Sequence, residues 1–133
     1  MRSLTIPSLL AVLLMAGCAA YGGATLLYVP TVVSAPPGFA VASPDAIQSP
    51  EGTRFHGSVC RRSINMSPTR IRVERIDASG AVVASASRPL WGLGGRARGC
   101  TFYDVPTDWR VGPGEHVRVC AQRSDAPCGR AGP

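Results

Sequence analysis

Apolar and polar residues alternate in several short runs along the second half of the chain. In the segment 53–60, Phe55 and Val59 fall on one face of an extended chain, and the segment 70–76 alternates in the same way around Val73. A period of two residues is typical of strands that have one buried face. The opposite face of the second segment, which we expect to meet solvent, is polar: Arg70, Arg72 and Glu74.

Turn residues separate these runs. Asp77 to Gly80 has the composition of a tight turn, so the run 81–87 is expected to return as the second strand of a hairpin. Two further β-prone runs follow: 100–105 and, after a Gly-Pro-Gly turn, 116–121. Short strands at this spacing, with no helical period, predict an all-β fold. We expect a small β-sandwich or barrel of about six or seven short antiparallel strands.

The chain begins with a different pattern. The apolar run 4–16 is too short to span a bilayer as a helix, but it has the length of the hydrophobic part of a signal peptide. Small residues then lead into a cysteine at Ala16-Gly17-Cys18. This ending resembles the lipobox of bacterial lipoproteins. The resemblance implies that residues 1–17 are a signal peptide that is removed, that the Cys18 thiol receives a diacylglyceryl group, and that the new amine is acylated.

Two details of the leader bear on this resemblance. Met15 stands where the family usually has leucine. Ala19 follows the cysteine, where an aspartate often signals retention in the inner membrane, so the resemblance implies an outer-membrane lipoprotein that faces the periplasm. The lipid would make the membrane a partner of the protein, since each buried CH₂ contributes about 0.8 kcal/mol. An ordinary secretory leader with an incidental Cys18 and a retained transmembrane anchor stay open as alternatives.

The composition changes at Pro50. Residues 18–50 are rich in Ala, Gly, Pro and Ser, so we expect a lipidated tether over this segment and a small folded domain over 51–133. The apolar stretch 26–33 fits a first strand as well as a linker, and Pro30 would restrict such a strand to the edge of a sheet. A domain of roughly 80 residues gains only marginal stability from burial, so covalent staples are expected.

Four cysteines follow Cys18: Cys60, Cys100, Cys120 and Cys128. An even number in a small exported domain predicts two disulfides. We favour the pairs Cys60–Cys100 and Cys120–Cys128, because the second loop is short enough to close locally. Cys60–Cys120 with Cys100–Cys128 stays open as the alternative. The sequence has no Cys-x-x-Cys pair, which argues against a metal site, thioredoxin-like redox chemistry and haem attachment.

Residues with catalytic potential are few. The only histidines are His56 and His116, and the alternation around each predicts a position on an outer strand face. Ser58 does not lie in a nucleophile-elbow motif, and the polarity of a turn accounts for Asp104 and Asp108. We therefore expect no catalytic residue, no metal, no cofactor and no small-molecule substrate. The chain is predicted not to be an enzyme.

The candidate surface for a partner is the glycine-rich segment 91–98. Trp91 is followed there by Arg96 and Arg98, and Trp and Arg are the side chains that often dominate protein interfaces. In the alternative interpretation, Trp91 is tucked into the core. The segment lacks the Lys-Ser/Thr ending of a phosphate-binding loop. The formal net charge of +6 is interpreted as solvated strand faces, with no nucleic acid as a partner.

The spacing of the strands loosely looks like that of small β-sandwich lipoproteins that serve as pilotins or accessory factors of bacterial secretion systems. The similarity rests on Gly57-x-Val59, on the run 71–77 and on a closing strand after Gly114. The lipid address, the small stapled domain and the lack of catalytic groups favour a non-enzymatic binding or assembly-accessory module of the cell envelope, with an envelope protein as its partner. The alternative function is inhibition of a periplasmic hydrolase, such as a lysozyme or a protease.

Overall fold

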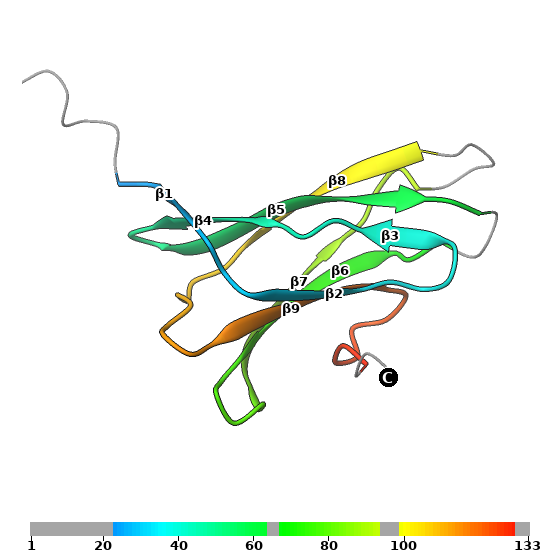
Figure 1. The fold of residues 1–133 in the computed structure, drawn as a ribbon. Helices are drawn as coiled ribbons and strands as arrows, with labels where there is room; N and C mark the ends of the chain where they lie inside the picture. The colour runs from blue at the N-terminus through cyan, green and yellow to red at the C-terminus, as the bar shows by residue number, and fades with distance from the viewer. Residues whose placement is uncertain (1–22, 64–66, 94–98, 130–133) are drawn as a thin grey trace, which may run out of the picture.

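The computed structural model describes residues 23–63, 67–93 and 99–129. Within these ranges the chain forms nine strands and no helix, so none that is long and apolar enough to cross a membrane. In chain order the strands are β1 (Thr25–Leu27), β2 (Thr31–Ser34), β3 (Phe39–Val41), β4 (Asp45–Ser49), β5 (Gly52–Arg61), β6 (Arg70–Ile76), β7 (Val82–Pro89), β8 (Gly99–Pro106) and β9 (His116–Gln122) (Figure 1).

The strands form two sheets that lie one over the other (Figure 1). The five-stranded sheet has the order β1-β4-β5-β3, and β8 pairs with the other side of β5. The four-stranded sheet has the order β2-β9-β6-β7, and β2 runs parallel to β9 while the other pairs are antiparallel. The prediction of a small all-β sandwich is therefore confirmed. The described residues hold more strands than the six or seven expected.

The core lies between the sheets and is built from the apolar positions of the alternating strands. The alternation expected over 53–60 is confirmed, because Phe55 and Val59 are fully buried while His56 is exposed. In the second predicted run, 70–76, Ile71 and Val73 are likewise fully buried. The other fully buried apolar side chains of the core are Val105, Val117 and Val119.

Tyr103 on β8 brings a polar atom into this core. Its hydroxyl donates a hydrogen bond to the Ala42 carbonyl oxygen at 3.0 Å. The ring lies against Gly57, where an added Cβ would come within 2.5 Å of the hydroxyl oxygen. Burial, followed by the charge of Asp45, raises the pKa of Tyr103. A side chain at position 57 would therefore collide with the Tyr103 ring.

Residues 25–49 form four strands of the sandwich, so the expected tether over 18–50 is wrong for this part of the chain. The prolines and glycines that suggested a tether occupy the connections: Pro30 separates β1 from β2, and the turn at Gly38 separates β2 from β3. The apolar residues between these breaks pack against the core: Leu27, Val29, Val33, Phe39 and Val41. The amino-acid composition predicted the turns correctly but did not predict the short strands between them.

The first two strands belong to different sheets. β1 pairs with β4 at one edge of the five-stranded sheet, and after Pro30 the chain continues as β2 at the edge of the four-stranded sheet. Of the two interpretations of 26–33, the strand is confirmed, although as two short strands. The Pro30 carbonyl accepts a hydrogen bond from the Val117 amide at 2.9 Å, which leads β2 into its register with β9. The predicted signal peptide and Cys18 lie outside the described residues.

The turn predicted at Asp77–Gly80 closes the β6–β7 hairpin. Gly80 has a φ of 87°, which glycine adopts without strain. Asp77 Oδ1 accepts hydrogen bonds from the backbone amides of Ser79 at 2.9 Å and Ala81 at 3.0 Å. Hydrogen bonding, above all from the Ser79 hydroxyl, lowers the pKa of Asp77. The side chain thus supports the backbone turn, as the sequence of this segment predicts.

Candidate binding surfaces

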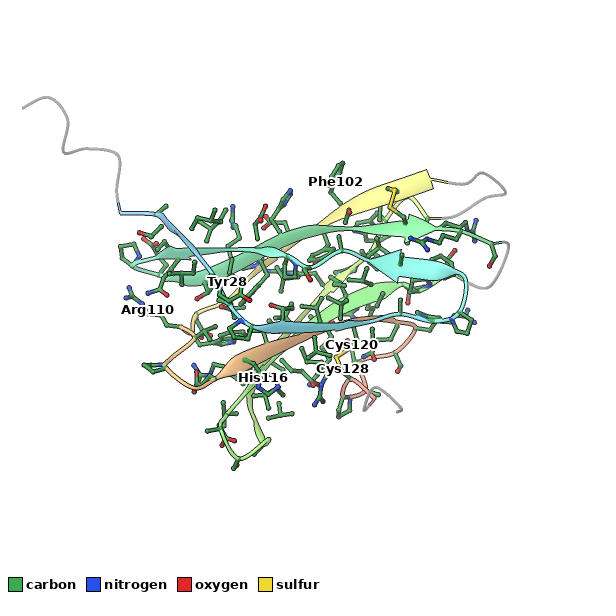
Figure 2. The ribbon with its side chains drawn as sticks, viewed as in Figure 1. Tyr28, Phe102, Arg110, His116, Cys120 and Cys128 are labelled. Atoms are coloured by element: carbon green, nitrogen blue, oxygen red, sulfur yellow. A yellow bond between two sulfur atoms is a disulfide. The ribbon has the colours of Figure 1, made fainter. Side chains whose placement is uncertain are left out.

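The cysteines pair as favoured from the sequence, Cys60 with Cys100 and Cys120 with Cys128, and the alternative pairing is excluded. Cys60 and Cys100 face each other across the β5–β8 ladder. Cys120 lies in β9 and Cys128 lies eight residues further along the chain, with their Cα atoms 5.8 Å apart. The first disulfide joins two strands that already pair, whereas the second ties the C-terminal segment to the outer face of the four-stranded sheet (Figure 2).

That C-terminal segment covers Glu74. The Glu74 side chain is fully buried, so the prediction that it faces solvent is wrong. Its Oε1 accepts hydrogen bonds from the Cys128 amide at 2.8 Å and from Arg72 Nε at 2.9 Å, and its Oε2 lies 3.3 Å from Arg118 Nη1. The alternation placed Glu74 correctly on the outer face of β6. It could not show that a disulfide-bonded tail would cover that face.

The tail makes further polar contacts with the same sheet. The Asp125 carbonyl oxygen accepts a hydrogen bond from Arg72 Nη1 at 3.1 Å. The Asp125 carboxylate pairs with Arg70 and accepts a hydrogen bond from Ser87 Oγ at 3.2 Å. Each of these contacts joins the tail to β6 or β7. The buried Glu74 carboxylate also holds the tail, because its Oε1 accepts the hydrogen bond of the Cys128 amide. Both oxygens of Glu74 are engaged, so neither is open to a ligand.

The outer face of the five-stranded sheet carries several of the residues that were considered as catalytic candidates. His56 on β5 lies opposite Asp104 on β8 and opposite Asp45 on β4. Its ring stacks on Phe102, with the ring centroids 6.1 Å apart and the planes at 4°. Asp104 pairs with Arg54 at 3.5 Å. These contacts leave Asp104 engaged with a guanidinium rather than with the imidazole.

Two of the other candidates do not join this row. His116 begins β9 in the other sheet, so the structure does not bring the two histidines together, and Asp108 follows β8 in a bend. Ser58 lies on the same outer face as His56, two residues further along β5, and pairs across the ladder with Phe102. Among the described residues, no group of three or more His, Cys, Asp or Glu side chains could hold a metal ion.

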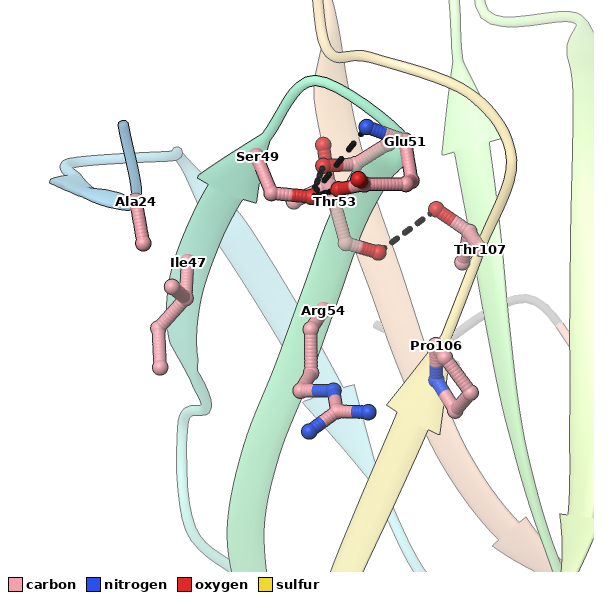
Figure 3. A pocket seen from close by; sticks show the side chains of 9 residues that line it. Ala24, Ile47, Ser49, Glu51, Thr53, Arg54, Pro106 and Thr107 are labelled. Atoms are coloured by element: carbon pink, nitrogen blue, oxygen red, sulfur yellow. Dashed lines mark hydrogen bonds between the residues drawn. The ribbon is translucent and has the colours of Figure 1, made fainter. Parts of the chain in front are cut away.

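A shallow pocket of about 440 Å³ lies beside the β4–β5 turn (Figure 3). Its polar groups serve the turn itself: Ser49 Oγ donates to Glu51 Oε2 at 2.6 Å, and Thr107 Oγ1 donates to the Thr53 carbonyl oxygen at 2.7 Å. The hydrogen bond from Ser49 is the largest of the causes that lower the pKa of Glu51. These two hydroxyls are committed to local hydrogen bonds, whereas the hydroxyl of Thr53, which also lines the pocket, is buried without a hydrogen-bond partner among the described residues.

Trp91 lies on the connection between β7 and β8, and 77% of its surface is exposed. The interpretation that it is tucked into the core is therefore wrong. Its neighbours Leu90 and Leu93 are buried and fill that place in the core. The backbone at Trp91 is held, because its carbonyl oxygen accepts a hydrogen bond from Thr101 Oγ1 at 2.6 Å. Arg96 and Arg98, the other residues of the predicted partner surface, lie outside the described residues.

The second tryptophan differs from Trp91. Trp109 packs against the core, with its ring centroid 5.5 Å from that of Phe55 and with the Arg75 guanidinium 5.5 Å above its ring. It is a structural residue at the β4–β5 end of the sandwich, where its carbonyl oxygen accepts a hydrogen bond from the Thr53 amide. Trp109 is partly buried, whereas Trp91 exposes most of its surface.

The sequence interpretation missed the exposed Phe102. It lies on β8, beside Thr101, whose hydroxyl holds the Trp91 backbone, and 75% of its surface is exposed. The signal was present in the alternation of 100–105, because Tyr103 and Val105 on the inner face place Phe102 on the outer one. Leu26 and Tyr28 are also exposed, in the stretch for which the sequence left a strand and a linker open.

Comparisons of this chain with protein-family models, with curated proteins and with solved structures find no match. Inferences about its role therefore depend on the leader sequence and on the surfaces described above.

Proposed function

We propose that this protein is an exported bacterial lipoprotein whose sandwich is a non-catalytic binding or assembly-accessory module of the cell envelope. The lipobox-like ending Ala16-Gly17-Cys18 supports the proposed processing and location: cleavage before Cys18, lipid on its thiol, and attachment to the outer membrane facing the periplasm. The observation that carries the binding role is the exposure of Trp91 on a connection between strands.

The exposed indole favours a partner because folding gains nothing from it. A tryptophan side chain buries roughly 150–250 Å² when it packs, and truncation of such an anchor at an interface costs about 2 kcal/mol or more. Leu90 and Leu93 already fill the adjacent core, so Trp91 has no structural task there. Arg96 and Arg98 follow in the sequence and would favour an acidic rim around the pocket of the partner.

The contacts of the polar side chains support a non-catalytic role. Glu74 is enclosed by two arginines and an amide, and Asp104 is paired with Arg54. Catalysis by acid, base or nucleophile requires groups that converge on open space at hydrogen-bonding distance. The carboxylates of Glu74 and Asp104 are each engaged with their own arginines instead.

Capture from envelope extracts tests this proposal. The lipidated wild-type protein should retain an envelope protein that the Trp91→Ala variant loses, while the Leu26→Ala variant, changed at the other end of the molecule, should retain it. Intact-mass analysis of the same preparation should give a chain that starts at Cys18 with acyl mass. Capture of a lysozyme or protease with loss of its activity would replace the accessory role by inhibition. Equal capture by wild type and Trp91→Ala would overturn the assignment of the surface.

A further inference from the structure

The beginning of the folded domain exposes large apolar side chains. Of the surface of Leu26, 68% is exposed, and of that of Tyr28, 95%. The residues between and after them, Leu27 and Val29, pack against the core. The chain therefore alternates here as an edge strand does, with one set of apolar residues buried and the other set directed away from the protein.

Folding alone does not account for this second set. β1 already pairs with β4, and Leu26 lies opposite Ile47 in that ladder. The Tyr28 side chain is almost wholly in solvent, so it contributes little to the core. Tyrosine is enriched at membrane–water interfaces, because its ring has an apolar body and a polar tip.

A cation lies near the start of β1, on the side of Thr25 and Leu27. Arg110 and Leu27 line one small hollow of about 270 Å³ together with Gly23 and Thr25. Arg110 Nη2 donates to the Ser49 carbonyl oxygen at 3.0 Å, which fixes the guanidinium near the start of β1 while its other N–H groups stay available. Figure 2 shows Tyr28 and Arg110 in the same part of the sandwich as β1. A fixed guanidinium is well suited to bind a phosphate.

The position of these residues in the chain indicates what covers them. Only five residue steps separate Cys18 from Gly23, and an extended chain spans at most about 3.6 Å per residue, so this distance cannot exceed roughly 18 Å. A lipid on Cys18 would therefore keep the start of β1 close to the headgroup layer. The expected tether of 18–50 would have allowed any orientation, but the observed fold does not contain it.

We propose that this end of the sandwich rests on the lipid surface, with Leu26 and Tyr28 in the headgroup layer and Arg110 against lipid phosphates. This inference depends on the lipidation of Cys18 in the proposed function and adds an orientation to it. The start of β5 lies at the membrane end, since Arg54 is paired with Ile47, the partner of Leu26.

The same orientation places Trp91 away from the membrane. Thr101, which holds the Trp91 carbonyl, pairs with Val59 towards the other end of β5. Leu26 lies at the level of Arg54 on β5 and Trp91 at the level of Val59, five residues further along, which is roughly 17 Å at about 3.3 Å per residue. The proposed partner surface would thus lie further along the strand from the membrane, and Trp91 would be presented to the periplasm.

Fluorescence quenching by brominated lipids tests this orientation. The lipidated chain is reconstituted in vesicles of phosphatidylethanolamine and phosphatidylglycerol whose acyl chains carry bromine near the headgroups. Three forms are compared: wild type, Trp91→Phe, and Tyr28→Trp with Trp91→Phe. The second form gives the background from Trp109. Replacement of an exposed tyrosine by tryptophan is not expected to disturb folding, and the melting temperature of each form checks this.

We expect the emission added by Tyr28→Trp to shift to the blue and to be largely lost in brominated vesicles, while the emission of Trp91 in the wild type keeps its intensity. An unquenched tryptophan at 28, or equal quenching at 28 and 91, would overturn the orientation. Shielding of residue 28 from an aqueous quencher without quenching by bromine would assign these residues to a protein partner and would also overturn it. Absence of acyl mass on the chain would instead count against the proposed lipoprotein itself.

Discussion

The outer faces of the two sheets have similar sequences but different structures. Both strands in question, β5 and β6, alternate apolar residues with arginine and other polar side chains. On the four-stranded sheet a disulfide-bonded tail covers this polar face and buries Glu74 between Arg72 and Arg118. On the five-stranded sheet the polar face stays open, and Asp104 and Arg54 form an exposed pair.

The difference teaches that pairs between arginine and a carboxylate stabilise the fold on the covered face of the four-stranded sheet and contribute little on the open face of the five-stranded sheet. A charge that is removed from water must keep its partners, so loss of one member of a buried cluster is costly. Exposed pairs are screened by solvent and contribute little. We infer that the polar residues of the covered face hold the fold together, and that recognition falls to the exposed aromatic side chains elsewhere.

The largest expected effect is that of Glu74→Ala. The substitution leaves Arg72, Arg118 and the Cys128 amide without their common acceptor. We expect the free energy of unfolding to fall by about 3–5 kcal/mol, as measured by urea denaturation. Glu74→Gln, which keeps the shape and an acceptor oxygen, should cost less. A loss below about 1 kcal/mol for Glu74→Ala would show that the buried cluster is no more important than an exposed pair.

The two disulfides also differ between the sheets, and we expect their removal to have different effects on stability and on the tail. The chain-entropy model gives about 4 kcal/mol for a loop of 40 residues and about 2.5 kcal/mol for one of eight, which are the separations of Cys60–Cys100 and Cys120–Cys128. We expect the paired alanine substitutions to lower the free energy of unfolding in that order. Only Cys120→Ala with Cys128→Ala should accelerate hydrogen exchange at the amide of residue 128, because only this change releases the tail.

Equal protection of that amide in both double variants would contradict the assigned role of the tail. It would mean that Glu74, rather than the disulfide, is sufficient to hold the segment in place.

A much smaller effect is expected from Asp104→Ala. The carboxylate and its partner Arg54 are 44% and 57% exposed, and pairs of this kind typically contribute about 0–1 kcal/mol. The melting temperature should therefore change little, and the change should decrease further in high salt. A destabilisation as large as that of Glu74→Ala would remove the distinction between the two faces.

The sequence predicted the features that depend on local pattern and missed those that depend on coverage. The alternation of Phe55 and Val59, the turn at Gly80 and the favoured disulfide pairing are confirmed. The burial of Glu74 was missed, because it depends on a tail more than 50 residues away in the sequence. A period of two residues shows which side chains share a face, but it does not show what lies above that face.

The same limit applies to the candidate surfaces. Trp91 could be singled out by residue type, but its exposure depends on Leu90 and Leu93 occupying the adjacent core. The stretch that holds Leu26 and Tyr28 fitted a strand and a linker equally well, because proline and glycine surround it in the sequence. Strands as short as β1 and β2 are stabilised by their neighbours in the sheets rather than by their own composition.

The smallest expected effect on stability, and the most direct test of the proposed role, is that of Trp91→Ala. Because its ring is exposed, the melting temperature should stay close to that of the wild type, while capture of the envelope partner should be lost. Removal of a buried tryptophan would instead cost about 3–5 kcal/mol. The measurement is one preparation of the variant, assayed for both melting temperature and partner capture. A strongly destabilised variant that still captures the partner would contradict the account.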